Sequence, residues 1–147
     1  MKKMIWHKTY TLEEVNDIFA KNMTGYLEIR AVAISHESLT VSMPVNDRVK
    51  QPYGLLHGGA SVVLAESVGS IASNLVVDHD AFMGVGMEVN ANHLRPVWDG
   101  EVRALCRPLH LGAKSHVWDI RIEDQKGNLV CVSRLTVAIV KRRNAND

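Results

Sequence analysis

The stretch QPYGLLHGGASVVLAESVGSIASNLVV, from Gln51 to Val77, decides how the rest of this chain folds. It opens on a turn-forming Gln-Pro-Tyr-Gly and passes through His57-Gly58-Gly59 into a long, nearly all-apolar run. The polar side chains from residue 60 to residue 77 are Ser61, Glu66, Ser67, Ser70, Ser73 and Asn74. A helix that is apolar on almost every side is normally enclosed by the rest of its domain. We therefore expect one central helix that the other elements cover.

Glu66 is the one carboxylate in this run. An ionised carboxylate in such a helix costs on the order of several kcal/mol unless it is hydrogen-bonded, paired or facing a cleft. No lysine or arginine lies between Lys50 and Arg95, so the neighbouring sequence offers no ion-pair partner. Two interpretations remain at this point: a glutamate at the wet edge of a core helix, or a working carboxylate that faces a pocket.

Length and composition limit the class of protein. The 147 residues predict one domain, residues 1–147, with 46% hydrophobic and 22% charged residues, which is ordinary for a globular protein. A net charge of +1 argues against a protein that binds nucleic acid or a membrane surface by bulk charge. Cys106 and Cys131 have neither metal-ligand spacing nor a disulfide-rich pattern, and we expect two reduced, buried thiols.

Targeting signals are not evident in the sequence. The first ten residues, MKKMIWHKTY, hold two lysines at the start but no apolar core of signal-peptide length. The longest apolar run is interrupted by Glu66 and Asn74, which argues against a membrane span. These features predict a cytoplasmic protein that does not act at a membrane.

The remaining elements are predicted from periodicity and turn residues. Thr11 and Glu14 have capping-box spacing, and apolar residues at helical spacing predict a short helix over residues 12–21 that Gly25 ends. Two strand-like runs around residues 27–32 and 39–43 form a plausible hairpin. Four further strands are expected after the central helix, over residues 82–94, 101–111, 115–123 and 129–140.

This order of elements predicts an α+β fold in which a strongly curved antiparallel sheet wraps one long helix, with a short helix near the N-terminus. Such a wrap leaves sheet edges and the start of the helix exposed. We therefore expect a homo-oligomer in which strands or interfaces are shared between copies.

The sequence also resembles a known family. The residues that carry the resemblance are Met43-Pro44-Val45, Gln51 to Ala60, Leu64 to Ser70, Asn90 to Pro96, Leu109 to Gly112, Val117-Trp118 and Ser133 to Thr136. Together they resemble the hotdog-fold acyl-CoA thioesterases, most closely the branch with 4-hydroxybenzoyl-CoA, 1,4-dihydroxy-2-naphthoyl-CoA and enterobactin-pathway proofreading thioesterases. The resemblance implies a hotdog fold, a tetramer built as a dimer of dimers, shared active sites, no metal, no cofactor, and hydrolysis of a thioester to an acid and a thiol.

Chemical roles follow for five residues of the central stretch. Gly58 stands where the helix begins, so its free N–H and the positive end of the helix can stabilise an oxyanion. Glu66 would act as the nucleophile or as the general base for water, and these alternatives stay open. Gln51 and His57 can position the acyl carbonyl or the loop. Ser70, one turn after Glu66, can hold a water or the carboxylate.

Coenzyme A would require contacts for its phosphates and its pantetheine arm. Arg95 and Lys114 are the best candidates for the phosphates. By resemblance the path is lined by two segments, the first being His93, Leu94, Arg95 and Pro96, and the second His110, Leu111, Gly112, Ala113, Lys114 and Ser115. Gly84 and Gly86 are unusual in a strand and predict close approach of backbone or ligand, or a bulge.

Eight residues of helix separate Gly58 from Glu66, a rise of about 12 Å. One helix therefore cannot bring both groups to the same carbonyl, and we expect the glutamate at each oxyanion donor to come from a second subunit. The leading hypothesis is hydrolysis of an aromatic or medium-sized acyl-CoA, most specifically of the 1,4-dihydroxy-2-naphthoyl type. The alternatives are a proofreading hydrolase for aryl groups on an acyl carrier protein, and a non-catalytic acyl-CoA-binding protein.

Overall fold

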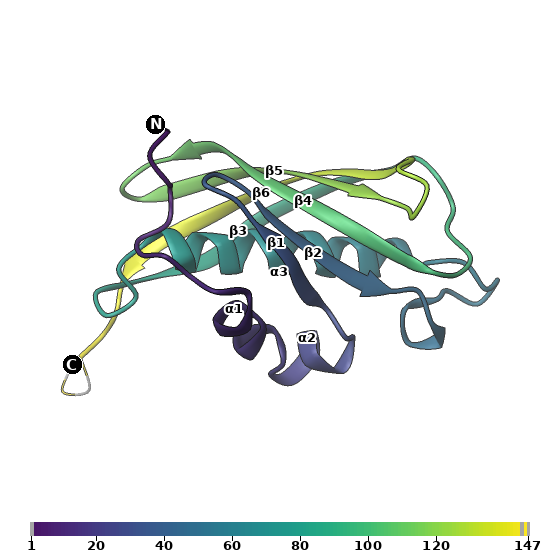
Figure 1. The fold of residues 1–147 in the computed structure, drawn as a ribbon, viewed down its shortest axis with the longest axis horizontal. Helices are drawn as coiled ribbons and strands as arrows, with labels where there is room; N and C mark the ends of the chain where they lie inside the picture. Colours follow the sequence, from purple (N-terminus) through teal and green to yellow (C-terminus); the bar gives the residue numbers. More distant parts are fainter. Residues whose placement is uncertain (1, 145, 147) are drawn as a thin grey trace.

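The computed structural model describes residues 2–144 and 146, and Figure 1 shows the order of its elements. The helices are α1 (Leu12–Phe19), α2 (Asn22–Tyr26), a 3-10 turn η1 (Asp47–Val49) and α3 (Gly58–Val76). The strands are β1 (Arg30–Ile34), β2 (Leu39–Pro44), β3 (Phe82–His93), β4 (Glu101–Leu111), β5 (Ser115–Glu123) and β6 (Leu129–Lys141). The four predicted strands after the central helix are confirmed to within one residue at each end.

The six strands form one antiparallel sheet in the order β1-β2-β4-β5-β6-β3. The sheet curves across α3, which lies along its concave face (Figure 1). Leu64, Ala65, Val68 and Ala72 of α3 are fully buried against inward-facing strand residues such as Trp118 and Leu135. The predicted α+β arrangement, a curved sheet around one long helix, is therefore confirmed.

α3 is long and apolar enough to cross a membrane by length and composition alone. In the fold it is the core helix, because the sheet covers one side of it along its length. Ser73, buried near its C-terminal end, accepts a hydrogen bond of 2.7 Å from Trp118 Nε1 and lies 2.9 Å from His116 Nδ1. The polar serine is thus paired inside the core, as buried polar groups must be.

The N-terminal helix begins as predicted but ends earlier. Glu14 N–H donates to Thr11 Oγ1 and Thr11 N–H donates to Glu14 Oε2, which completes the capping box. The helix predicted over residues 12–21 ends at Phe19, because Lys21 has an extended backbone (φ −90°, ψ 138°) and Asn22, with a φ of 55°, begins the separate helix α2. Gly25 lies inside α2 rather than after the helix. A Cβ there would stand 2.0 Å from the carbonyl oxygen of Ala20, so only glycine fits this contact.

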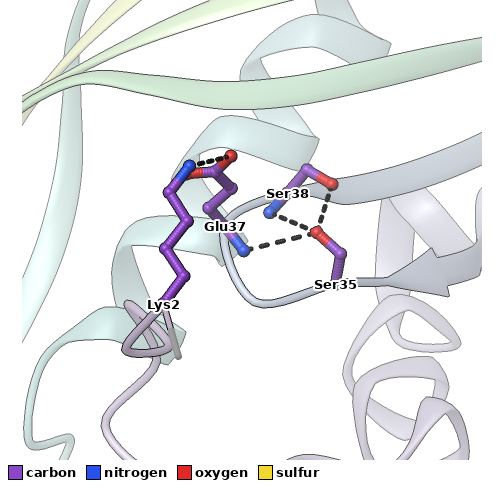
Figure 2. A network of polar contacts seen from close by, with 4 residues as sticks. All are labelled: Lys2, Ser35, Glu37 and Ser38. Atoms are coloured by element: carbon purple, nitrogen blue, oxygen red, sulfur yellow. Dashed lines mark hydrogen bonds and ion pairs between the residues drawn. The ribbon is translucent and has the colours of Figure 1, made fainter.

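The β1–β2 hairpin is fixed by a small polar network (Figure 2). Ser35 Oγ accepts hydrogen bonds from the N–H groups of Glu37 and Ser38, and Lys2 Nζ donates to the Glu37 carboxylate at 2.8 Å. Trp6 Nε1 also donates to the carbonyl of Ser35. These contacts attach the N-terminal segment to the hairpin tip.

Within residues 2–144 and 146, β3 is an edge strand that pairs with β6 alone. Gly84 allows close packing on α3, since a Cβ there would lie 3.1 Å from Ser73 Cβ, and its N–H donates to Asn74 Oδ1 at 2.9 Å. The register shifts between Gly86 and Glu88. Close approach and a bulge, the two alternatives for these glycines, therefore both occur on this strand.

Cys106 and Cys131 are free and buried, as expected from the sequence. Burial raises the pKa of both thiols, and the nearby Asp119 carboxylate adds to the effect at Cys106. Both side chains therefore pack as small apolar groups rather than as nucleophiles.

Candidate active site

The start of α3 presents an open backbone donor. His57 is the N-cap, and its Nδ1 accepts a hydrogen bond of 2.8 Å from the Gly59 N–H. The Gly58 N–H makes no hydrogen bond to any residue that the structure describes. A free N–H at the positive end of a 19-residue helix is suited to a developing negative charge.

The turn before α3 is held by its own backbone. Gln51 N–H donates to the Leu55 carbonyl at 2.8 Å, and Gly54, with a φ of 94°, donates back to the Gln51 carbonyl at 2.9 Å. Gln51 Oε1 accepts from the Tyr53 N–H. Leu56 N–H donates to the Val97 carbonyl at 2.7 Å, which joins this turn to the loop between β3 and β4.

A pocket of about 390 Å³ lies between the turn and that loop. It is lined by Gln51, Leu55, Leu56, Gly58, Ser61, His93, Leu94, Arg95, Pro96 and Val130. Six predicted site residues from two segments of the chain thus meet in one place. His93 lies beside the helix start, because a Cβ on Gly58 would stand 2.9 Å from its Nε2. Among the described residues no carboxylate lines the pocket, so its guanidinium, Arg95, favours an anion.

Leu55, Leu56, Ser61 and Val130 line the pocket but were not predicted as site residues. Leu55, Leu56 and Ser61 lie within Gln51–Val77, close in sequence to the predicted site residues Gln51, His57 and Gly58, so this proximity could have predicted them. Val130 comes from β6, where the Leu94 N–H donates a hydrogen bond to its carbonyl. This contact between distant segments is not visible in the sequence.

Glu66 lies away from this pocket, in the middle of α3. Its side chain is half-buried and makes no hydrogen bond or ion pair within the part of the chain that the structure describes. It faces β3 together with Ser70: a Cβ on Gly86 would stand 2.6 Å from Glu66 Oε1 and 3.5 Å from Ser70 Oγ. Glu66, Ser70 and Gly86 therefore form a second cluster, separate from Gly58 within one chain.

The segment from His110 to Ser115 lies at the opposite end of α3 from His93. Leu111, Gly112 and Ala113 line a cavity of about 400 Å³ together with Val76 and Val77. His110 turns back onto the loop, since a Cβ on Gly112 would stand 2.6 Å from His110 Nε2. The two segments predicted to line one ligand path are therefore not brought together by a single chain.

Metal ligands are not gathered anywhere in residues 2–144 and 146: no three His, Cys, Asp or Glu side chains are placed to hold an ion. Gly58, Glu66 and Arg95 offer a backbone hydrogen-bond donor, a carboxylate that can act as nucleophile or base, and a cation that can bind an anion.

The chain is similar to known proteins over most of its length. Residues 53–131 match the family model of the thioesterase superfamily. The 1,4-dihydroxy-2-naphthoyl-CoA hydrolase of Escherichia coli is 53% identical over 137 residues, 93% of this chain and 100% of the relative. The proofreading thioesterase EntH of Cronobacter sakazakii is 44% identical over 137 residues, 93% of this chain and 99% of the relative.

Solved structures of thioesterases have the same fold as this chain. A mutant thioesterase from Pseudomonas aeruginosa has a TM-score of 0.92 at 51% identity and covers 94% of this chain and 99% of its own. A thioesterase from Haemophilus influenzae has a TM-score of 0.92 at 40% identity and covers 98% of this chain and 100% of its own. The class predicted from the resemblance, a thioester hydrolase with the hotdog fold, is confirmed. The chain belongs to the thioesterase superfamily.

Proposed function

We propose that this protein hydrolyses aromatic acyl-CoA thioesters of the 1,4-dihydroxy-2-naphthoyl type to the free acid and coenzyme A. The observation that carries the proposal is the N–H of Gly58, which opens at the start of α3 into a pocket; among the described residues this N–H has no hydrogen-bond partner and the pocket has no carboxylate. The name of the 53% identical relative supports the choice of acyl group. The product would then serve menaquinone synthesis in the cytoplasm.

In the proposed reaction the thioester carbonyl oxygen accepts a hydrogen bond from the Gly58 N–H, which stabilises the negative charge of the tetrahedral intermediate. Glu66 of a second copy acts as the nucleophile or as the general base. As a nucleophile it attacks the carbonyl carbon and expels the CoA thiolate, and water then hydrolyses the mixed anhydride. As a general base it takes a proton from the attacking water and passes it to the thiolate as the C–S bond breaks.

The second copy would join along the free edge of β3. This 12-residue strand carries the exposed apolar residues Met83, Val85 and Met87, the last with 68% of its surface accessible. A long, apolar edge is a template for pairing with another chain. A two-fold axis near Val89 or Asn90 would set Gly86 of one strand opposite residues 92–94 of the other. Glu66, which lies on Gly86, would then approach the partner's Gly58, which lies beside the partner's His93.

The same pairing explains why the ligand path is incomplete in one chain. The segment His93–Pro96 would bind the coenzyme from one copy, while His110–Ser115 would contribute from another copy. Two such dimers would associate into the tetramer implied by the resemblance. Within this arrangement Arg95 and Lys114 remain the proposed phosphate contacts.

The second candidate function is proofreading of aryl groups on an acyl carrier protein. The EntH relative, 44% identical over nearly its whole length, supports this alternative. Both functions use the same cleavage of a thioester and differ in the thiol that carries the acyl group.

The test is release of free thiol from benzoyl-, naphthoyl- and fatty acyl-CoA esters and from an aryl carrier protein. The wild type and Glu66→Gln are compared, with circular dichroism to show that both are folded. We expect the naphthoyl-CoA ester to rank first and Glu66→Gln to lose about 10²-fold or more in kcat. Preference for the carrier-bound ester would select the second candidate. A folded wild type that hydrolyses none of these esters would contradict both.

A further inference from the structure

Trp98 is an exposed indole beside the candidate active site. The chain has three tryptophans, of which Trp6 and Trp118 are buried, whereas Trp98 keeps 57% of its surface accessible. A Cβ on Gly54 would stand 3.9 Å from Trp98 Cζ3, so the indole rests on the turn that positions Gln51. Its main chain belongs to the loop between β3 and β4, next to Arg95. A large aromatic side chain left accessible at the mouth of a site is available to a ligand.

Trp98 lines a cavity of about 400 Å³ between this loop and the turn of residues 124–128. Arg95 and Pro96 line both this cavity and the pocket that holds Gly58. The two hollows are therefore neighbours on one surface. A ligand whose reacting end enters the Gly58 pocket can extend its other end across Trp98.

Two cations line the same cavity as the indole. Arg95 and Lys126 both line the cavity, and the side chain of neither makes a hydrogen bond or ion pair with a described residue. Two carboxylates, Asp99 and Asp124, also line it. Asp124 is occupied by its own turn: its oxygens accept from the Asn128 N–H at 2.9 Å, the Lys126 N–H at 2.9 Å and the Asn128 side chain at 3.1 Å. The Asn128 and Lys126 donors, with a smaller effect of Arg95, lower the pKa of Asp124.

We propose that Trp98, Arg95 and Lys126 form the docking site for the nucleotide end of coenzyme A. The indole would stack on the adenine, and the two cations would meet the 3′-phosphate and the diphosphate. Aromatic stacking of a base and charge-assisted contacts to phosphate are the two interactions that such a ligand offers. A concave site of this volume fits a nucleotide better than the flat face of a carrier protein. The proposal rests on the proposed function and adds Trp98 and Lys126 to the residues that recognise its substrate.

The kinetic test compares two thioesters of the same acid, one of coenzyme A and one of N-acetylcysteamine, which lacks the nucleotide. Trp98→Ala and Lys126→Ala should each raise KM for the CoA ester about tenfold with little change in kcat. They should leave the kinetics of the short ester as in the wild type. Trp98→Phe should restore most of the affinity, because phenylalanine also stacks. Lys141→Ala, an exposed lysine at the far end of β6, is the matched control.

Equal losses on both esters, or no change on the CoA ester, would overturn the proposal. Loss confined to an ester on an aryl carrier protein would also overturn it and would assign this surface to the carrier.

A binding test does not depend on catalysis. Adenosine 3′,5′-bisphosphate and pantetheine are titrated separately while tryptophan fluorescence is followed. The nucleotide should quench the exposed Trp98, and Trp98→Phe should abolish the quenching, whereas pantetheine should leave the signal of Trp98 unchanged. If the wild type hydrolyses no CoA ester, the proposed function is wrong. Quenching of Trp98 fluorescence by the nucleotide still tests whether the docking site binds it. Absence of quenching at saturating nucleotide would reject the docking site by itself.

Discussion

The carboxylate of Glu66 lies against the backbone of Gly86, so that a Cβ on this glycine would stand 2.6 Å from Oε1. The edge strand β3 therefore sets the position of the side chain to which we assign the chemical step. This contact also explains why a residue with low strand propensity occupies a strand that is 12 residues long.

Gly86→Ala should displace the Glu66 carboxylate and lower kcat about tenfold or more, because a base or nucleophile acts only in the correct geometry. KM for the CoA ester should change less than kcat. Gly84→Ala is the matched control. Its Cβ would meet Val137 and Ser73 instead of Glu66, so it should lower Tm while kcat stays near the wild-type value. Equal kcat values for the two folded variants would contradict this role of Gly86.

His57 caps α3 through its Nδ1, which accepts from the Gly59 N–H. His57→Ala should lower the free energy of unfolding by about 1 kcal/mol and reduce kcat as well, because the helix start loosens around Gly58. His57→Asn should keep both near wild type, since asparagine is among the best N-cap residues. Urea unfolding and thiol release measure the two effects. An inactive but fully stable His57→Asn would instead assign the imidazole a direct role in the reaction.

Most of the fold could be predicted from the sequence because the β-strands alternate apolar and polar residues between clear turns. The break between α1 and α2 could not, because it depends on the extended backbone of Lys21, the positive φ of Asn22 and a close contact of Gly25, none of which changes the apolar spacing. In the site, Gly58 could be predicted because it begins the core helix, and Glu66 because it is the one carboxylate in that apolar run. Val130 and Trp98 did not, since each reaches the site by tertiary packing of a separate segment.

His116 gives a pH dependence to stability. Its burial, with a smaller contribution from the nearby His110, lowers its pKa in the folded protein. The unfolded chain titrates near pH 6.5, so below that pH it takes up a proton that the folded state does not. The free energy of unfolding should therefore fall as the pH drops from about 7.5 to about 5.5.

His116→Gln should flatten this dependence, which urea unfolding at the two pH values measures. Glu14, Glu37 and Asp124 have lowered pKa values in the folded protein, through their hydrogen bonds above all, and their stabilisation is lost only as the pH falls below about 5. They do not contribute in this window. An equally steep fall in His116→Gln would show that His116 is not the titrating group.

In the proposed dimer each active site takes its oxyanion donor and Gln51 from one copy and Glu66 from another. The most direct test combines two variants that are each inactive, Gln51→Ala and Glu66→Gln, by co-expression with different tags and isolation of the mixed pool. If sites are shared, half of the randomly mixed dimers are heterodimers with one intact site, so about one quarter of wild-type activity should return. Activity no higher than the sum of the two separate variants, in a pool shown to contain heterodimers, would contradict the shared site.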